Sequence, residues 1–205
     1  MGALGASPAG KGGLSVGGRS MVARVVAAVG SVVGRVVVVI GPTHRLPPFD
    51  HAVDVVHDTS PDSGPLAGLA DGLRHVGRAV RPCPSLAVVC PCDVPLLRPA
   101  LVRAMLERAA GSGAAWTIPI VGGQPQLLLS VIRPESLAHV EHRLAAGRRD
   151  LRGLATDFVA AGLVVDRVAA DELRGVDPRL ESFADVDVPE DLRSLEDGGI
   201  PSSPP

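Results

Sequence analysis

Two runs of apolar residues without alternation constrain the fold of this chain more than any other feature. Residues 36–40 read Val-Val-Val-Val-Ile, and residues 86–90 read Leu-Ala-Val-Val-Cys. Such runs are typical of strands that are buried on both faces of a sheet, which occurs mainly where helices cover both faces. Segments with helical spacing lie around them, at residues 20–29, 64–80 and 98–110. The sequence therefore predicts an α/β fold with a doubly wound, mostly parallel sheet.

The rest of the chain continues this alternation. We expect further strands at residues 52–56, 115–120, 126–132, 163–168 and 183–187, and further helices at 134–146, at 150–160 and from residue 189. A length of 205 residues fits one domain of this class. We place that domain at residues 20–197, after a glycine-rich loop at 1–19 and before a disordered tail at 198–205.

Composition and charge exclude several classes of function. The chain has 20 basic and 22 acidic residues, a net charge of −2, which argues against a nucleic-acid binder held by a basic surface. The apolar stretch 20–41 is long enough for a membrane span, but Arg24 and Arg35 interrupt it, so we expect a helix and a strand there and no membrane contact. An odd count of three cysteines without a secretory signal favours a reducing cytoplasm, with the cysteines as buried filler.

One carboxylate lies where doubly wound sheets bind their ligands, beyond the carboxyl end of a strand. Asp93 directly follows the strand at 86–90, and Pro91 and Pro95 flank it. Mg²⁺ prefers oxygen ligands and keeps several waters, so a lone carboxylate there can hold it against substrate phosphates. From the pattern alone, a simple cap of the next turn explains Asp93 equally well.

Two glycine-containing segments are candidates for contacting phosphates. Gly64, Pro65 and Gly68 open a helix, where free N–H groups and a closely approaching backbone suit an anion or a base edge. Lys11, the only lysine of the chain, lies in a glycine-rich stretch that lacks the spacing of a P-loop. An ordinary helix start and a flexible tail with a chance lysine are the alternatives.

An acidic segment near the C-terminus is the last candidate. Asp185 and Asp187 alternate on the strand expected at 183–187, so both would face one side of it. The sequence alone favours a capped helix start with solvated acids over a metal site here.

Taken in order, these segments resemble the molybdenum cofactor guanylyltransferase family over residues 11–195. The resemblance rests on Gly-Pro-Leu-Ala-Gly at 64–68 together with Pro-Cys-Asp-Val-Pro at 91–95. It extends to four further points: Lys11, Asp58, the pair Gln124 and Pro125, and the acidic segment 185–192.

The resemblance implies a nucleotidyltransferase that uses Mg²⁺ to join GMP from GTP to molybdopterin with release of pyrophosphate, and a molybdoenzyme chaperone as a partner. It implies that Lys11 contacts the nucleotide phosphates, that Asp58 and the segment 64–68 bind GTP, and that Asp93 ligates Mg²⁺. It places four residues on the pterin side: Gln124, Arg152, Asp185 and Asp187.

The N-terminal part departs from the family pattern. The family begins with an apolar strand and a Leu-Ala-Gly-Gly loop, whereas residues 1–10 read Met-Gly-Ala-Leu-Gly-Ala-Ser-Pro-Ala-Gly. That strand would lie inside the sheet, beside the strand that ends at Asp93, so its absence would leave unpaired backbone groups and an apolar gap. Either a coding stretch lies upstream of Met1, which we favour because the other motifs are kept, or the chain is a degenerate copy.

Two other functions remain open at the level of sequence. A related nucleotidyltransferase could use CTP or another acceptor, since the loop that reads the base is missing. A degenerate, non-catalytic paralogue could bind the pterin only.

Overall fold

The apolar stretch 20–41 forms a helix followed by a strand, as predicted. The structure, a computed structural model, describes residues 15–16, 18–60, 64–79 and 82–185. Ser20 accepts a hydrogen bond from the Ala23 N–H at 3.3 Å and caps helix α1 (Met21–Gly30), and β3 (Val36–Ile40) follows. In the described ranges, no helix is both long and apolar enough to span a bilayer.

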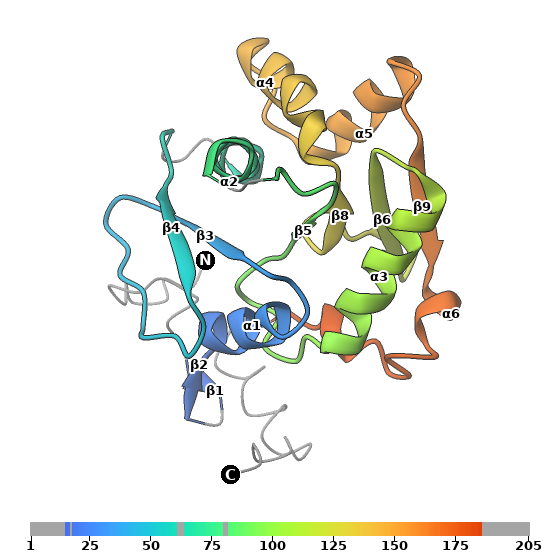
Figure 1. Cartoon of the computed structure of the whole chain (residues 1–205). Helices are drawn as coiled ribbons and strands as arrows, with labels where there is room; N and C mark the ends of the chain where they lie inside the picture. Colours follow the sequence, from blue (N-terminus) through green and yellow to red (C-terminus); the bar gives the residue numbers. More distant parts are fainter. Residues whose placement is uncertain (1–14, 17, 61–63, 80–81, 186–205) are drawn as a thin grey trace, which may run out of the picture.

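The strands form two main sheets (Figure 1). In the smaller one, β3 pairs in parallel with β4 (Val53–His57). The larger one joins five strands: β5 (Ala87–Val89), β8 (Ser130–Ile132), β6 (Trp116–Val121), β7 (Gln124–Pro125) and β9 (Val165–Ala169). The two five-residue ladders, β3–β4 and β6–β9, are parallel, whereas β8 runs antiparallel between β5 and β6. The α/β class is therefore confirmed, with parallel pairing in the longest ladders.

Two helical layers enclose these strands. On one side α1 and α3 (Pro99–Ser112) share a hydrophobic core that contains Met105 and Val131. On the other side α2 (Pro65–Ala79), α4 (Leu137–Ala145) and α5 (Leu151–Ala160) pack around Trp116 and Phe158. Both rings are fully buried, with centroids 5.8 Å apart.

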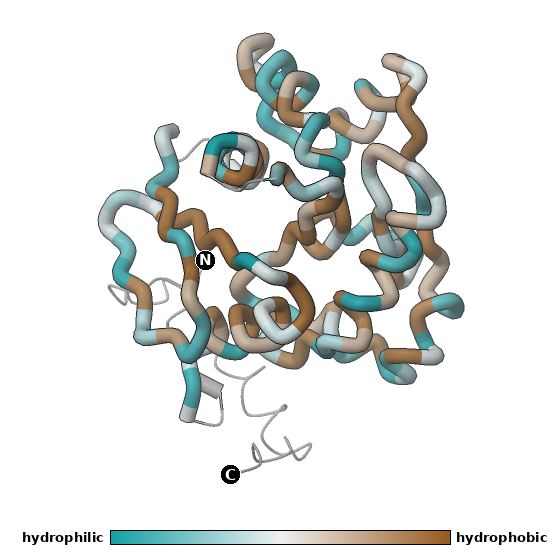
Figure 2. Tube along the Cα trace, viewed as in Figure 1, coloured by the Kyte–Doolittle hydropathy of each residue, from teal (hydrophilic) through white to brown (hydrophobic). Residues whose placement is uncertain are grey.

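The strands predicted to be buried on both faces are only half-buried. Every residue of β3 and of β5 has intermediate exposure. Within the described residues β3 pairs only with β4 and β5 only with β8, so each has an unpaired edge there. Figure 2 shows β3 as a continuous hydrophobic run.

Three boundaries differ from the prediction. Part of the loop expected at 1–19 is a short antiparallel pair, β1 (Ser15–Val16) and β2 (Arg19–Ser20), because Gly18 takes the left-handed φ of 78° that reverses the chain. The strand expected at 126–132 begins only at Ser130. Helix α3 runs past Gly111 to Ser112, and Gly113 caps its end with φ 67°.

The strand expected at 183–187 is also wrong in its described part. A 3₁₀ helix, η3 (Glu181–Phe183), ends at Phe183, after Leu180 in the left-handed region with φ 56°. The fully buried carboxylate of Asp177 accepts the N–H groups of Glu181 (3.2 Å) and Ser182 (2.9 Å), which stabilises this turn. The remaining short elements are η2 (Pro134–Ser136) and α6 (Ala170–Leu173).

Candidate active site

The loop after β5 presents Asp93 at the carboxyl end of the strand. Asp93 is half-buried, whereas the next residue, Val94, is 4% exposed and belongs to the core below α1. The Leu97 N–H donates to the Val94 carbonyl at 3.1 Å, which closes a turn after the motif. The core thus anchors the loop on the C-terminal side of the carboxylate.

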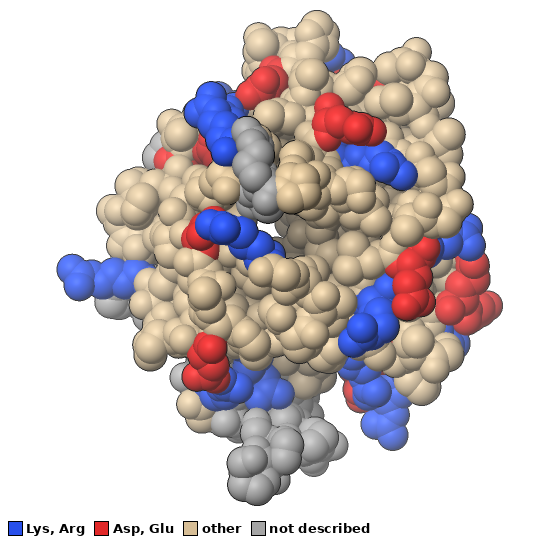
Figure 3. All heavy atoms as spheres, viewed as in Figure 1, with Lys and Arg blue, Asp and Glu red and all other residues tan. Residues whose placement is uncertain are grey.

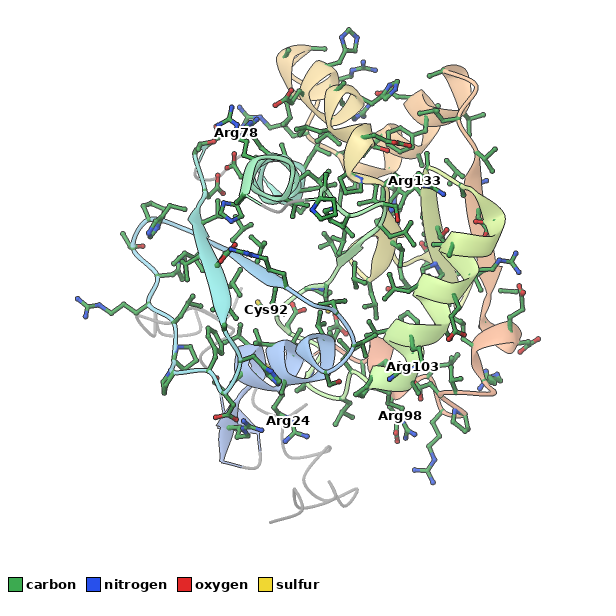
Figure 4. All side chains as sticks on the ribbon, viewed as in Figure 1. Arg24, Arg78, Cys92, Arg98, Arg103 and Arg133 are labelled. Carbon is green, nitrogen blue, oxygen red and sulfur yellow. The ribbon has the colours of Figure 1, made fainter. Side chains whose placement is uncertain are left out.

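A second anchor comes from helix α1. Arg24 donates its Nε–H to the Pro95 carbonyl oxygen at 3.0 Å, and its position against α1 is visible in Figure 4. Burial, followed by the charge of Arg19, lowers the pKa of Arg24. The motif is therefore held both by apolar packing and by a hydrogen bond from 71 residues earlier in the chain.

The cysteines beside Asp93 correct an expectation from the sequence. Cys90 is half-buried, and burial, followed by the charges of Cys92 and Asp93, raises the pKa of its thiol. Cys83 and Cys92 are exposed, so they are not buried filler, because both lie in the loops that flank β5. Figure 4 shows Cys92 between β3 and α1, and Figure 3 shows the surface hollowed near the centre of this face.

Asp58 and the predicted glycines lie at the connection from β4 to α2. The Asp58 N–H donates to the Ile40 carbonyl at 2.8 Å, which extends the parallel ladder by one residue. Gly64 has φ 79°, a conformation that favours glycine, and Pro65 is the first residue of α2. A Cβ on Gly68 would meet Val39 of β3 at 3.9 Å, an ordinary van der Waals contact, so the packing of α2 on β3 does not itself require glycine there.

Gln124 and Arg152, distant in sequence, are in direct contact. Arg152 Nη2 donates to Gln124 Oε1 at 3.2 Å. Both line a pocket of about 220 Å³, whose other lining residues are Ile118, Pro125, Leu127, Ala155, Thr156 and Arg167. The pocket contains two guanidinium groups and no carboxylate, and within the described part of the chain neither arginine forms an ion pair.

This pocket and Asp93 lie at the same edge of the larger sheet. β5 and β6 both run antiparallel to β8, so they point in the same direction. The Asp93 loop follows the end of β5, and Gln124 pairs with Val121 at the end of β6. Carboxyl ends of strands at one edge are where open α/β sheets bind ligands.

A buried arginine orients the helix that carries Arg152. Arg143, 4% exposed, donates to the Asp150 carbonyl oxygen at 2.9 Å and to Asp157 Oδ2 at 2.8 Å, and it also pairs with the Asp150 carboxylate. Asp150 caps α5 by accepting the Gly153 N–H at 2.6 Å. This backbone hydrogen bond and Arg143 lower the pKa of Asp150, and Arg143 lowers that of Asp157.

Of the remaining predicted residues, the structure describes only Asp185. Asp185 is exposed, two residues after η3. Lys11 and Asp187 lie outside the described residues, as does the tail at 198–205. Among the described residues, no cluster of three or more His, Cys, Asp and Glu side chains could hold a metal ion. A single carboxylate such as Asp93 still fits Mg²⁺, which in nucleotide-binding sites takes one or two carboxylates, waters and substrate phosphates.

Comparison with known proteins decides the family. The model of the MobA-like NTP transferase domain matches residues 4–160. The chain belongs to this family. The matched range contains Lys11, Asp58, Asp93, Gln124 and Arg152 and ends before Asp185, so all but the acidic segment of the predicted site lies within it.

Individual relatives agree. A probable molybdenum cofactor guanylyltransferase from Natronomonas pharaonis is 36% identical over 137 residues, 66% of this chain and 60% of that protein. A molybdenum cofactor guanylyltransferase from Pseudomonas aeruginosa is 34% identical over 141 residues, 68% of this chain and 63% of that protein. The chain spans about three fifths of the length of the curated relatives it matches.

Solved structures support the fold. Molybdopterin-guanine dinucleotide biosynthesis protein A from Archaeoglobus fulgidus superposes with a TM-score of 0.71 at 20% identity, over 92% of this chain and 89% of that one. A 2-C-methyl-D-erythritol 4-phosphate cytidylyltransferase from Thermus thermophilus superposes with a TM-score of 0.67 at 19% identity, over 93% and 95%.

Sequence reasoning missed two polar side chains of the pocket, those of Arg167 and Thr156. Arg167 lies on β9 next to Asp166, which pairs with Arg108 at 2.7 Å. Strand alternation alone indicates that Arg167 faces the other side. Thr156 follows Arg152 by four residues on α5, so both occupy one helix face. The sequence did not reveal that these two faces meet at the Gln124 turn.

Proposed function

We propose that this chain is a nucleotidyltransferase that transfers GMP from GTP to molybdopterin. Family membership and the two guanylyltransferase relatives support this reaction. The observation that carries the proposal is the placement of Asp93 and the Gln124–Arg152 pocket at one edge of the sheet. The loop with Asp93 suits a phosphate chain, and the Gln124–Arg152 pocket suits a planar, polar acceptor.

The chemistry requires alignment and charge neutralisation more than proton transfer. The terminal phosphate of the acceptor is ionised at neutral pH, and one of its oxygens attacks the α-phosphorus of GTP. The bond to the β-phosphate breaks and pyrophosphate leaves with its electron pair. Mg²⁺, when bound, neutralises phosphate charge, which is the larger part of catalysis in such transfers.

We assign roles to the residues of this chain on that basis. Asp93 holds the metal from a loop fixed by Val94 and by Arg24. Asp58, Gly64 and Pro65 contact the nucleotide from the β4–α2 connection, together with Lys11. Gln124 and Arg152 hold the acceptor, and Arg167 joins them because it lines the same pocket. The further predicted contacts are Gly68 with the nucleotide and Asp185 and Asp187 with the pterin.

Pyrophosphate release tests the proposal. The purified chain with Mg²⁺, GTP and molybdopterin should release pyrophosphate, and Asp93→Ala should lower the rate at least about 100-fold, because it removes a charge aligned with the reacting phosphates. Asp171→Ala is the matched control, since this carboxylate is 93% exposed and lies on α6. Unchanged release in Asp93→Ala would remove the central argument.

CTP is a second candidate for the nucleotide. The likeness of this fold to that of a cytidylyltransferase, at a TM-score of 0.67, is the observation that favours CTP. Competition of CTP against GTP in the same assay separates the two. Binding of molybdopterin without binding of either nucleotide would instead favour a non-catalytic pterin-binding protein, such as a partner of a molybdoenzyme chaperone.

A further inference from the structure

A buried carboxylate on α2 holds the loop that carries Asp58. Asp71 is 4% exposed, and its Oδ2 accepts the backbone N–H of Thr59 at 2.8 Å. The Thr59 hydroxyl also donates to this carboxylate, with its oxygen 3.0 Å from both Oδ1 and Oδ2. Backbone and side chain of one exposed loop residue thus converge on one buried group.

The loop is fixed on both sides of Thr59. The Asp58 N–H donates to the Ile40 carbonyl of β3 at 2.8 Å. Asp58 Oδ1 accepts the Ser60 N–H at 2.8 Å, which orients the carboxylate within the loop. Residues 58–60 therefore have their backbone N–H groups engaged in sequence by β3, by α2 and by Asp58 itself.

The charge of Asp71 is compensated away from the loop. Arg74 Nη1 donates to Asp71 Oδ1 at 2.5 Å, and Arg74 Nη2 donates to Glu141 of α4 at 2.7 Å. Arg74 therefore provides the charge partner of Asp71 from within the protein, without a ligand. Among the described residues, its other hydrogen bonds go to Thr59, next to Asp58, which suits a role in positioning that residue.

We propose that Asp71 is a positioning residue for nucleotide binding: it fixes the main chain at Thr59 so that Asp58 is oriented toward GTP before GTP arrives. The proposal rests on the proposed function, in which Asp58 contacts the nucleotide. Preorganisation of this kind strengthens binding because the ordering cost is met before the ligand binds.

The test is a titration of the full chain with GTP and Mg²⁺, together with steady-state kinetics. Asp71→Asn should raise the Kd and the KM for GTP about 10-fold, because the amide cannot accept at both positions from Thr59 while facing Arg74. The kcat and the KM for molybdopterin should change less than about 2-fold. Thr59→Val should raise the Kd for GTP severalfold, and Thr59→Ser should restore the wild-type value because it keeps the hydroxyl and the N–H.

A matched control separates positioning from general stability. Glu141→Gln weakens the Arg74 contact on α4 and leaves the Thr59 contacts intact, so its Kd for GTP should match the wild type. All variants are compared well below their melting temperatures. A purely structural loss would reduce the fraction of active protein. It would therefore lower the apparent kcat without changing the KM for GTP or the KM for molybdopterin.

The outcomes distinguish this inference from the proposed function. An unchanged Kd for GTP in Asp71→Asn, with binding present in the wild type, overturns the role of Asp71 alone. Pyrophosphate release unchanged in Asp93→Ala overturns the proposed function, and the titration still judges Asp71. Absence of GTP binding by the wild-type chain overturns both.

Discussion

The two sides of this molecule differ in how completely the described chain covers them. In the half built on the larger sheet, Trp116, Ile132, Leu154 and Phe158 are fully buried, with α2, α4 and α5 packed around them. In the half built on the smaller sheet, every residue of β3 is half-exposed, and Val55 of β4 is 46% exposed. The difference teaches that the helices packed on the larger sheet bury its core. By contrast, β3 in the smaller sheet and β5 at the end of the larger one each keep an unpaired edge among the described residues.

Paired valine truncations test that difference most strongly. Val131 of β8 is 1% exposed and Val38 of β3 is half-exposed, so the same change removes the same two methyl groups from unequal surroundings. Val131→Ala should lower the free energy of unfolding by about 2.5 kcal/mol and Val38→Ala by about 1 kcal/mol. Urea denaturation measures both, and equal losses would mean that β3 is as well covered as β8.

A glycine on α5 tests how firmly Arg143 holds that helix in the half built on the larger sheet. A Cβ at Gly153 would lie 1.8 Å from Arg143 Nη2, so Gly153→Ala should displace the guanidinium from Asp150 and Asp157. We expect a loss of about 2 kcal/mol in urea denaturation. Gly111→Ala in α3 is the control, since its Cβ would meet nothing within 4 Å. That change should stabilise by up to about 1 kcal/mol, and similar values for both would refute the Arg143 clamp.

The pocket itself should discriminate between the two substrates. Arg167→Ala should raise the KM for molybdopterin about 10-fold and leave the KM for GTP unchanged, because Arg167 lines the Gln124–Arg152 pocket. Arg103→Ala removes an equally exposed charge from α3 and should change neither KM (Figure 4). A rise in the KM for GTP would place the nucleotide in this pocket instead.

The smallest expected effect concerns the dependence of stability on pH at β4, in the smaller sheet. Asp54 of β4 accepts hydrogen bonds from Arg35 at 2.7 and 2.9 Å and contacts His75 Nε2 at 2.7 Å. These partners, Arg35 first, lower its pKa from 3.8 to about 2. Since the folded pKa is the lower one, the contribution to stability is complete above about pH 4 and is lost as the pH falls toward 2.

Asp54→Asn should therefore flatten the dependence of stability on pH between about pH 4 and pH 2. Thermal unfolding at several pH values across that window measures this dependence. Asp171→Asn, at a carboxylate that is 93% exposed, should leave the curve of the wild type unchanged. An Asp54→Asn variant that keeps the full dependence of stability on pH would show that Asp54 does not contribute to it.

The sequence by itself determined the order of helices and strands and the position of Asp93 after β5. Both depend on local patterns: β-branched runs, helical spacing, and prolines that end a strand. The same patterns predicted a helix and a strand at residues 20–41 rather than a membrane span. They failed at residues 183–185, where the Asp177 carboxylate, four and five residues before the N–H groups that it accepts, holds a 3₁₀ turn instead of a strand.

Only the tertiary structure decided which residues share a site. The contact between Gln124 and Arg152, the direction of Arg167 into their pocket, and the hold of Asp71 on Thr59 join segments 12 to 43 residues apart. Such contacts follow from the register of β6 with β7 and β9 and from helix packing, which no local pattern specifies. The half-exposure of β3 has the same cause, because burial of a strand depends on what pairs with its edges rather than on its own residues.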